Sequence, residues 1–101
     1  MNVPRLPSHP GEILMQDFLV PRGLTQTTLA NALGISVTRV NEIVKGKRGV
    51  TAETAWMLAG AFGTSPEFWG NLQMAYDLAR ARPALLVKKL PTNGATNGSR
   101  R

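Results

Sequence analysis

The sequence predicts an all-α fold of five helices, and three observations support this prediction. Serine, threonine and proline residues that suit helix starts alternate along the chain with glycine and proline residues that suit helix ends. Between these signals, apolar residues recur at spacings of three and four, as on the buried face of a helix. The chain has 101 residues, 43% of them hydrophobic, which is enough for one compact domain but not for two independent cores.

Signals at both ends bound the first two predicted helices. A helix from about residue 10 to residue 20 opens with Pro10 and is stopped by Pro21. A shorter helix follows a cap at Thr25 and ends at Gly34, where a left-handed residue is favourable. Their core-facing residues should be Ile13, Leu14, Phe18, Leu29, Ala30 and Leu33.

A third helix, from about Val37 to Val44, follows Gly34 after a very tight turn and is capped by Ser36. Its inward residues repeat at spacings of three and four and are Val40, Ile43 and Val44. A small Ala30, a glycine at the turn and a branched residue behind it form the pattern of a helix-turn-helix motif between Thr25 and Val44.

Two further helices complete the predicted domain. Thr51 caps the fourth helix, whose inner face should be Ala55, Leu58, Ala59 and Phe62. The fifth begins after Gly63 with the capping pattern Thr-Ser-Pro-Glu and runs to about Arg82, where Pro83 halts it. Its core stripe should be Phe68, Leu72, Ala75 and Ala79.

The predicted organisation is an extended arm over residues 1–8, a helical domain over residues 9–82, and a flexible, disordered tail over residues 83–101. The net charge of +6 comes entirely from the six basic residues after residue 79, because residues 1–79 hold six basic and six acidic side chains. The tail could add phosphate contacts or only raise solubility. Residues 36–50 are nevertheless locally basic, with four cationic side chains and one acidic side chain.

Composition excludes several kinds of site. The absence of cysteine rules out disulfides and thiolate metal ligands, and His9 alone cannot complete a metal shell, so no metal or cofactor is expected. A catalytic base is hard to assemble, so we do not expect an enzyme. No apolar run approaches the roughly 18 residues that cross a bilayer, and no secretory signal pattern is present, so a cytoplasmic location is expected.

A helix held across another by a tight turn fits the major groove of DNA, so the outward face of the third helix is expected to read bases. The predicted base-reading residues are Val37, Thr38, Arg39, Asn41 and Glu42. The predicted phosphate-contacting residues flank them and are Gln26, Ser36, Lys45, Lys47 and Arg48. The alternative is a purely structural helical corner followed by a solvated basic loop.

Operators read by two recognition helices about 34 Å apart require a dimer, and the fifth helix is a candidate for pairing. A second line of side chains, offset from its predicted core stripe, consists of Trp69, Gln73, Tyr76 and Arg80. The alternative is that the aromatic members of this line cover the core of their own domain. Trp56 and Met57 lie off the inner face of the fourth helix, where packing is the simpler explanation and an interface the other.

Three separated motifs resemble the HigA-type antitoxins, within the phage-repressor-like helix-turn-helix class. They are His9-Pro10-Gly11-Glu12-Ile13-Leu14, then Gly46-Lys47-Arg48-Gly49-Val50-Thr51-Ala52-Glu53-Thr54-Ala55, and then Phe62-Gly63-Thr64-Ser65-Pro66-Glu67-Phe68-Trp69 with Asn71-Leu72-Gln73. The resemblance covers roughly residues 8–79. The tail after Arg82 is longer and more basic than the pattern requires.

The resemblance implies a five-helix, phage-repressor-like domain that dimerises, binds a palindromic operator and represses its own operon. It also implies a partner toxin of the ribosome-dependent mRNA endonuclease type. The positions that it places at the DNA face are Gln26, Ser36, Thr38, Arg39, Asn41 and Lys47 or Arg48. The alternative is a stand-alone transcriptional regulator of the same class that has no toxin.

Overall fold

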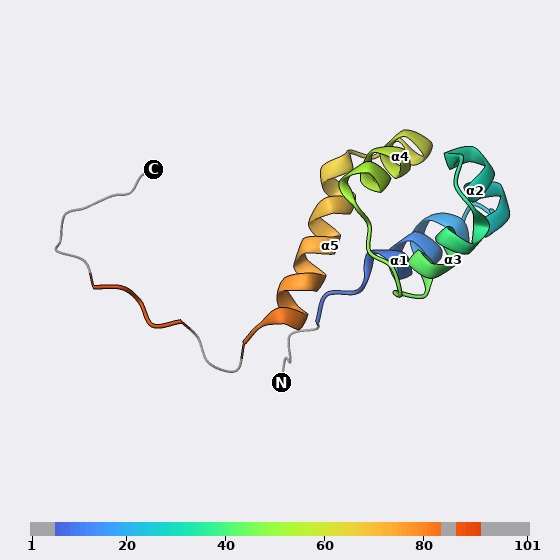
Figure 1. Cartoon of the computed structure of the whole chain (residues 1–101). Helices are drawn as coiled ribbons and strands as arrows, with labels where there is room; N and C mark the ends of the chain where they lie inside the picture. Colours follow the sequence, from blue (N-terminus) through green and yellow to red (C-terminus); the bar gives the residue numbers. More distant parts are fainter. Residues whose placement is uncertain (1–5, 84–86, 92–101) are drawn as a thin grey trace.

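The computed structural model describes residues 6–83 and 87–91. The elements of residues 6–83 are α1 (Pro10–Ile13), η1 (Leu14–Leu19), α2 (Gln26–Leu33), α3 (Val37–Val44), α4 (Ala52–Phe62) and α5 (Pro66–Ala81). Because α1 and η1 form one continuous segment, the predicted all-α order of five helices is confirmed. In Figure 1, α2 and α3 pack together at one end, and α1 lies between α3 and the long α5, touching both.

Side-chain caps set the starts of the last four helices, as the sequence predicts. In each case a hydroxyl oxygen accepts a hydrogen bond from the backbone N–H three residues later, at 3.0 to 3.2 Å. The capping residues are Thr25, Ser36, Thr51 and Ser65. Gly34 and Gly63 end α2 and α4 in the left-handed region, each with φ of 73°. The helix boundaries therefore follow from local sequence.

The first helical segment departs from the regular α-helix that was expected. After α1 it widens into the π-helical segment η1, where the N–H of Val20 donates to the carbonyl of Met15 at 3.0 Å. A turn closed after five residues brings Leu14 and Leu19 to the core, where they are 1% and 0% exposed. The predicted stripe included Leu14 but missed Leu19, because it assumed α-helical spacing throughout.

The hydrophobic core joins all the helices around a few buried branched side chains. Leu29 and Ala30 of α2, Val40 and Ile43 of α3, and Leu58 of α4 belong to one cluster of buried residues. The predicted inner faces of α2, α3 and α4 are therefore confirmed. Trp56 of α4 is 68% exposed, so the packing role that the sequence favoured for it is wrong.

The predicted core stripe of α5 is confirmed only at Leu72, which packs against the core, and is wrong at its other positions. Phe68 is 38% exposed, and Ala75 and Ala79 lie on the surface, whereas Trp69 is completely buried. The indole N–H of Trp69 donates to the hydroxyl of Thr64 at 2.7 Å, so the largest side chain of the helix enters the core without losing a hydrogen bond. Trp69 therefore packs inside its own domain, and its side chain is not available to pair with a second chain.

Aromatic rings surround the buried indole. The ring centroid of Phe18 lies 4.9 Å from that of Trp69 and 5.0 Å from that of Phe62. The Phe68 ring meets Trp69 edge to face at 5.1 Å. These distances are typical of favourable aromatic pairs, which fix ring orientation as well as burying area. The aromatic cluster joins η1 to α4 and α5.

Outside this domain, residues 87–91 form no regular element, and Val87 and Leu90 are 94% and 79% exposed. The disorder predicted for residues 83–101 falls mostly on residues outside the described ones, as does most of the predicted arm over residues 1–8. Among the described residues, no helix has the length and apolar character needed to span a membrane.

His9 caps α1 and packs against α5. Its Nδ1 accepts a hydrogen bond from the N–H of Gly11 at 2.9 Å, so this nitrogen carries no proton, and its ring meets Tyr76 edge to face at 4.8 Å. Burial lowers the pKa of His9 below its ordinary value of 6.5; nearby Asp77 opposes this shift and Arg80 reinforces it. The fold therefore favours the neutral imidazole.

Replacing His9 with Asn should remove a pH dependence of stability. Because the folded-state pKa is depressed, the stabilisation is complete above about pH 6.5 and is lost as pH falls through the folded pKa. Asn still caps the helix but does not titrate in this range. Urea unfolding of the wild type between pH 8 and pH 5 should show a decline that His9→Asn lacks. His9→Ala should lose about 1 kcal/mol even at pH 8; parallel pH curves for wild type and His9→Asn would contradict this assignment.

Candidate nucleic-acid interface

The helix-turn-helix motif is formed by α2, α3 and the three residues between them. Gly34 ends α2, the N–H of Ile35 donates to the carbonyl of Ala30 at 3.0 Å, and Ser36 caps α3. Val40 and Ile43 are 1% and 2% exposed, so α3 is held on its inner side and presents its other side outward. This is the geometry that lets a helix enter the major groove.

A close contact also fixes α3 from the side of α1. A Cβ atom on Gly11 would lie 1.7 Å from the carbonyl oxygen of Ile43, so only glycine allows this approach between the two helices. Gly11 and Pro10 are both buried there. The end of the recognition helix is therefore packed directly against α1.

The outward residues of α3 separate into two groups. Val37, which is 44% exposed, and Thr38 project freely from the first turn. Arg39 instead turns toward α4, where its Nη2 donates to the Thr54 hydroxyl at 3.0 Å and its Nε is buried without a hydrogen-bond partner. The structure thus uses Arg39 to join α3 to the first turn of α4. Base contact by Arg39 stays a prediction.

Asn41 and Gln26 were expected to act separately, but the structure brings them together. The Nδ2 of Asn41 donates to the Oε1 of Gln26 at 3.1 Å, across the gap between α3 and α2. Gln26 keeps both of its Nε2 hydrogens, and Asn41 keeps its Oδ1 acceptor. The pair therefore presents donors and an acceptor side by side, as the edge of an adenine does.

The loop after α3 carries the exposed basic side chains Lys45, Lys47 and Arg48. Glu42, one of the predicted base-reading residues, forms an ion pair with Arg48 at 2.8 Å. The far end of the loop is held by Gln73 of α5, whose Oε1 accepts from the N–H of Val50 at 2.7 Å. The loop is thus tied to both α3 and α5, beside the outward face of α3.

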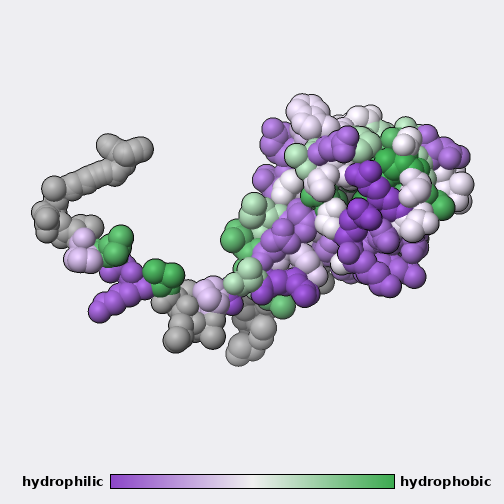
Figure 2. Space-filling model, in the orientation of Figure 1, coloured by the Kyte–Doolittle hydropathy of each residue, from purple (hydrophilic) through white to green (hydrophobic). Residues whose placement is uncertain are grey.

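The residues predicted for dimerisation serve mainly their own chain. Trp69 is buried, Gln73 holds the basic loop, and Tyr76 packs on His9. Arg80 is exposed and lies against Tyr76, donating to its hydroxyl at 3.0 Å. Sequence reasoning missed the exposed apolar pair Met74 and Leu78, which are 58% and 65% exposed. Their spacing of four residues was the available signal. Hydrophobic residues along an edge of α5 are visible in Figure 2.

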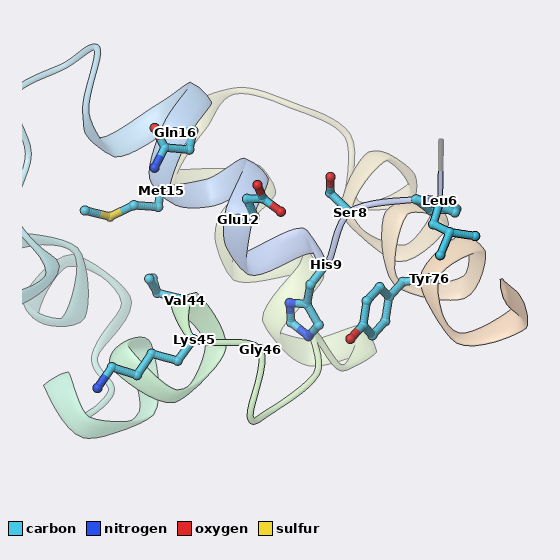
Figure 3. Close-up of a pocket in the computed structure, with 11 residues that line it drawn as sticks. Leu6, Ser8, His9, Glu12, Met15, Gln16, Val44, Lys45, Gly46 and Tyr76 are labelled. Carbon is cyan, nitrogen blue, oxygen red and sulfur yellow. The ribbon is translucent and has the colours of Figure 1, made fainter. Parts of the chain in front are cut away.

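Two pockets lie elsewhere on the described part of the chain. One, of about 550 Å³, lies where the start of α1, the end of α3 and α5 meet, and Figure 3 shows His9, Glu12, Lys45 and Tyr76 around it. The second, of about 340 Å³, lies between α2 and α4 beside the exposed Trp56. Neither pocket lies on the outward face of α3. The candidate interface is therefore a projecting surface, as nucleic-acid recognition through the major groove requires.

Comparisons with known proteins agree with this geometry. The family model described as "Helix-turn-helix" matches residues 15–69. Virulence-associated protein I of Dichelobacter nodosus is 51% identical over 73 residues, which cover 72% of this chain and 68% of that protein. Antitoxin HigA-1 of Vibrio cholerae is 45% identical over 75 residues, covering 73% of this chain and 70% of the relative.

A solved structure of a relative has a similar fold. The Pseudomonas aeruginosa antitoxin HigA, solved with the higBA promoter, is 47% identical and superposes with a TM-score of 0.73 over 74% of this chain and 82% of its own. The phage-repressor-like resemblance of the three sequence motifs is thereby confirmed. The chain belongs to the helix-turn-helix family and, within it, to the HigA-type antitoxins.

Proposed function

We propose that this chain is a cytoplasmic transcriptional repressor that binds a palindromic operator in double-stranded DNA as a homodimer and neutralises a partner toxin. The observation that carries the DNA-binding part is the outward face of α3, held by the buried Val40 and Ile43 and flanked by the exposed basic loop. The similarity to an antitoxin HigA that was solved with the higBA promoter supports DNA binding by this chain.

Within this proposal the DNA contacts divide by chemistry. Val37 and Thr38 offer methyl groups for thymine, and the Asn41–Gln26 pair offers the donors and acceptor that suit adenine. Lys45 and Lys47 contact phosphates, which positions the protein without selecting sequence. Ser36, at the capped end of α3, adds a phosphate contact through the helix N-terminus.

Asn41→Ala should lower affinity for the preferred duplex about 5- to 150-fold, because one base contact contributes about 1–3 kcal/mol of discrimination. Lys47→Gln should instead weaken specific and nonspecific binding alike and reduce the salt dependence by about one phosphate contact. The preferred duplex is first selected from random DNA by the purified protein, and affinities are then measured by fluorescence anisotropy at several salt concentrations. Asn71→Ala, at an exposed position of α5, is the control and should bind as the wild type does. Equal affinities for Asn41→Ala and wild type would contradict the proposal.

Dimerisation through α5 accounts for its exposed apolar edge. Met74 and Leu78 lie one helical turn apart on a part of α5 that its own domain leaves uncovered, and the small side chains Ala75 and Ala79 lie beside them. Two copies of such a helix bury these side chains symmetrically, as a two-fold axis requires. Exposed Arg80 stays a predicted contact, and Trp69 is withdrawn from the interface because it is buried.

Charged residues at this edge should separate the dimer. Light scattering of the wild type should give twice the 10.9 kDa mass of the chain, and the double substitution Met74→Glu with Leu78→Glu should give the single mass with an unchanged helical circular dichroism spectrum. Val20→Glu, which places one such charge on another exposed apolar residue, should leave the dimer intact. A doubly substituted chain that still scatters as a dimer would rule out this α5 interface.

The antitoxin part of the proposal is supported by membership of the HigA-type family. A neighbouring reading frame for a small basic ribonuclease should encode a protein that copurifies with this chain, and the complex should stop that ribonuclease from cutting mRNA in a translation extract containing ribosomes. The stand-alone regulator predicts that operator binding persists while no neighbouring product forms a complex. That result would remove the toxin from the proposal and leave the repressor.

We also infer a binding function in place of catalysis. The single histidine, His9, uses its Nδ1 to cap α1 and packs its ring on Tyr76, so it is not free to act as a general base.

A further inference from the structure

Glu42 holds the basic loop through both its main chain and its side chain. Its carbonyl oxygen accepts hydrogen bonds from the N–H groups of Lys47 and Arg48, at 2.8 and 3.2 Å. Its carboxylate oxygen Oε1 accepts from the Nε of Arg48 at 2.9 Å and from the Nη2 at 2.8 Å. One residue of the recognition helix therefore fixes both the backbone and the guanidinium of Arg48.

The position of this carboxylate needs an explanation. Glu42 is the only acid in residues 36–50, on a helix whose outward side is proposed to meet a polyanion, where a bare negative charge opposes binding. Both hydrogen bonds from Arg48 fall on Oε1, so the pairing with Arg48 orients the carboxylate and leaves only Oε2 to accept from a base such as cytosine. Fold stability does not explain it either, because half-exposed ion pairs contribute little.

Arginine can use the remaining part of its guanidinium while paired. The carboxylate takes the Nε hydrogen and one Nη2 hydrogen, which leaves the Nη1 group and the second Nη2 hydrogen available as donors. A paired guanidinium has also lost its rotamer freedom before it meets DNA, so less is lost when it binds. Arg48 is exposed and lies in the loop directly after α3.

We propose that Glu42 is a positioning residue, which holds Arg48 in the orientation where its free N–H groups meet an operator phosphate. This inference rests on the proposed function, because it concerns how the same surface binds DNA. Glu42 itself contacts no base. The cost of its negative charge is offset because an oriented Arg48 binds a phosphate more tightly than a freely rotating one does.

The test uses a substitution for which simple electrostatics and positioning predict opposite signs. Glu42→Gln makes the protein more positive, so charge alone predicts tighter DNA binding. Positioning predicts weaker binding, about 3- to 10-fold for Glu42→Gln and more for Glu42→Ala, because a neutral acceptor holds a guanidinium less strongly than a carboxylate does. Glu53→Gln, the same change at an exposed acid on α4, is the matched control and should bind the selected duplex as tightly as the wild type or more tightly.

A double-substitution cycle and a measurement without DNA complete the test. In the Arg48→Ala background, Glu42→Gln should no longer weaken binding, because there is no guanidinium left to position. In the free protein, ¹⁵N relaxation should show the Arg48 Nε to be ordered in the wild type, with an order parameter that falls below about 0.6 in Glu42→Ala.

The outcomes separate this inference from the proposed function. Unchanged or tighter binding by both Glu42 variants would overturn the positioning role while leaving operator binding intact. A changed preference at one base pair, additive with Arg48→Ala, would show Glu42 to be a base reader and would also overturn it. A wild-type protein that selects no duplex would refute the proposed function, and this inference with it.

Discussion

The close packing of α3 against α1 is the constraint on which the proposed DNA surface depends. Gly11 lets the carbonyl of Ile43 approach to a distance that no side chain permits, while Val40 and Ile43 fill the core on the same side. A helix of eight residues is too short to be stable in isolation, so α3 owes its order to these contacts. The outward face of α3 is held in place because the inward residues of the same helix are packed in the core.

Polar contacts extend this rigidity from the core to the surface. Arg39 joins α3 to α4, Asn41 joins it to Gln26 of α2, and Glu42 joins it to the basic loop. Each contact restricts a long or polar side chain that would otherwise lose conformational entropy on meeting DNA. The surface is therefore organised before any partner arrives. Gln73 connects this surface to α5, so the proposed dimer helix and the basic loop share a contact.

The two sides of α5 have different surroundings. Its inner side contributes the buried Trp69 and the Gln73 contact, and its outer edge carries Met74 and Leu78 without cover from the rest of the described domain. A helix with two apolar faces buries one of them within its domain, and the other is the face for which a partner is proposed. Trp56 on α4 is another large apolar side chain that the described domain leaves uncovered, at 68% exposed.

The sequence by itself determined the all-α class, the number of helices and their ends, because hydroxyl caps, left-handed glycines and prolines act within one turn of the backbone. It also predicted the inward residues of α2, α3 and α4. Only the tertiary structure decided the facing of α5, the widened turn that buries Leu19, and the partners of Arg39 and Glu42. These features depend on contacts between residues distant in the chain, or on the rotation of a helix about its own axis by a few tens of degrees. Periodic patterns do not resolve such rotations when a helix carries two apolar faces.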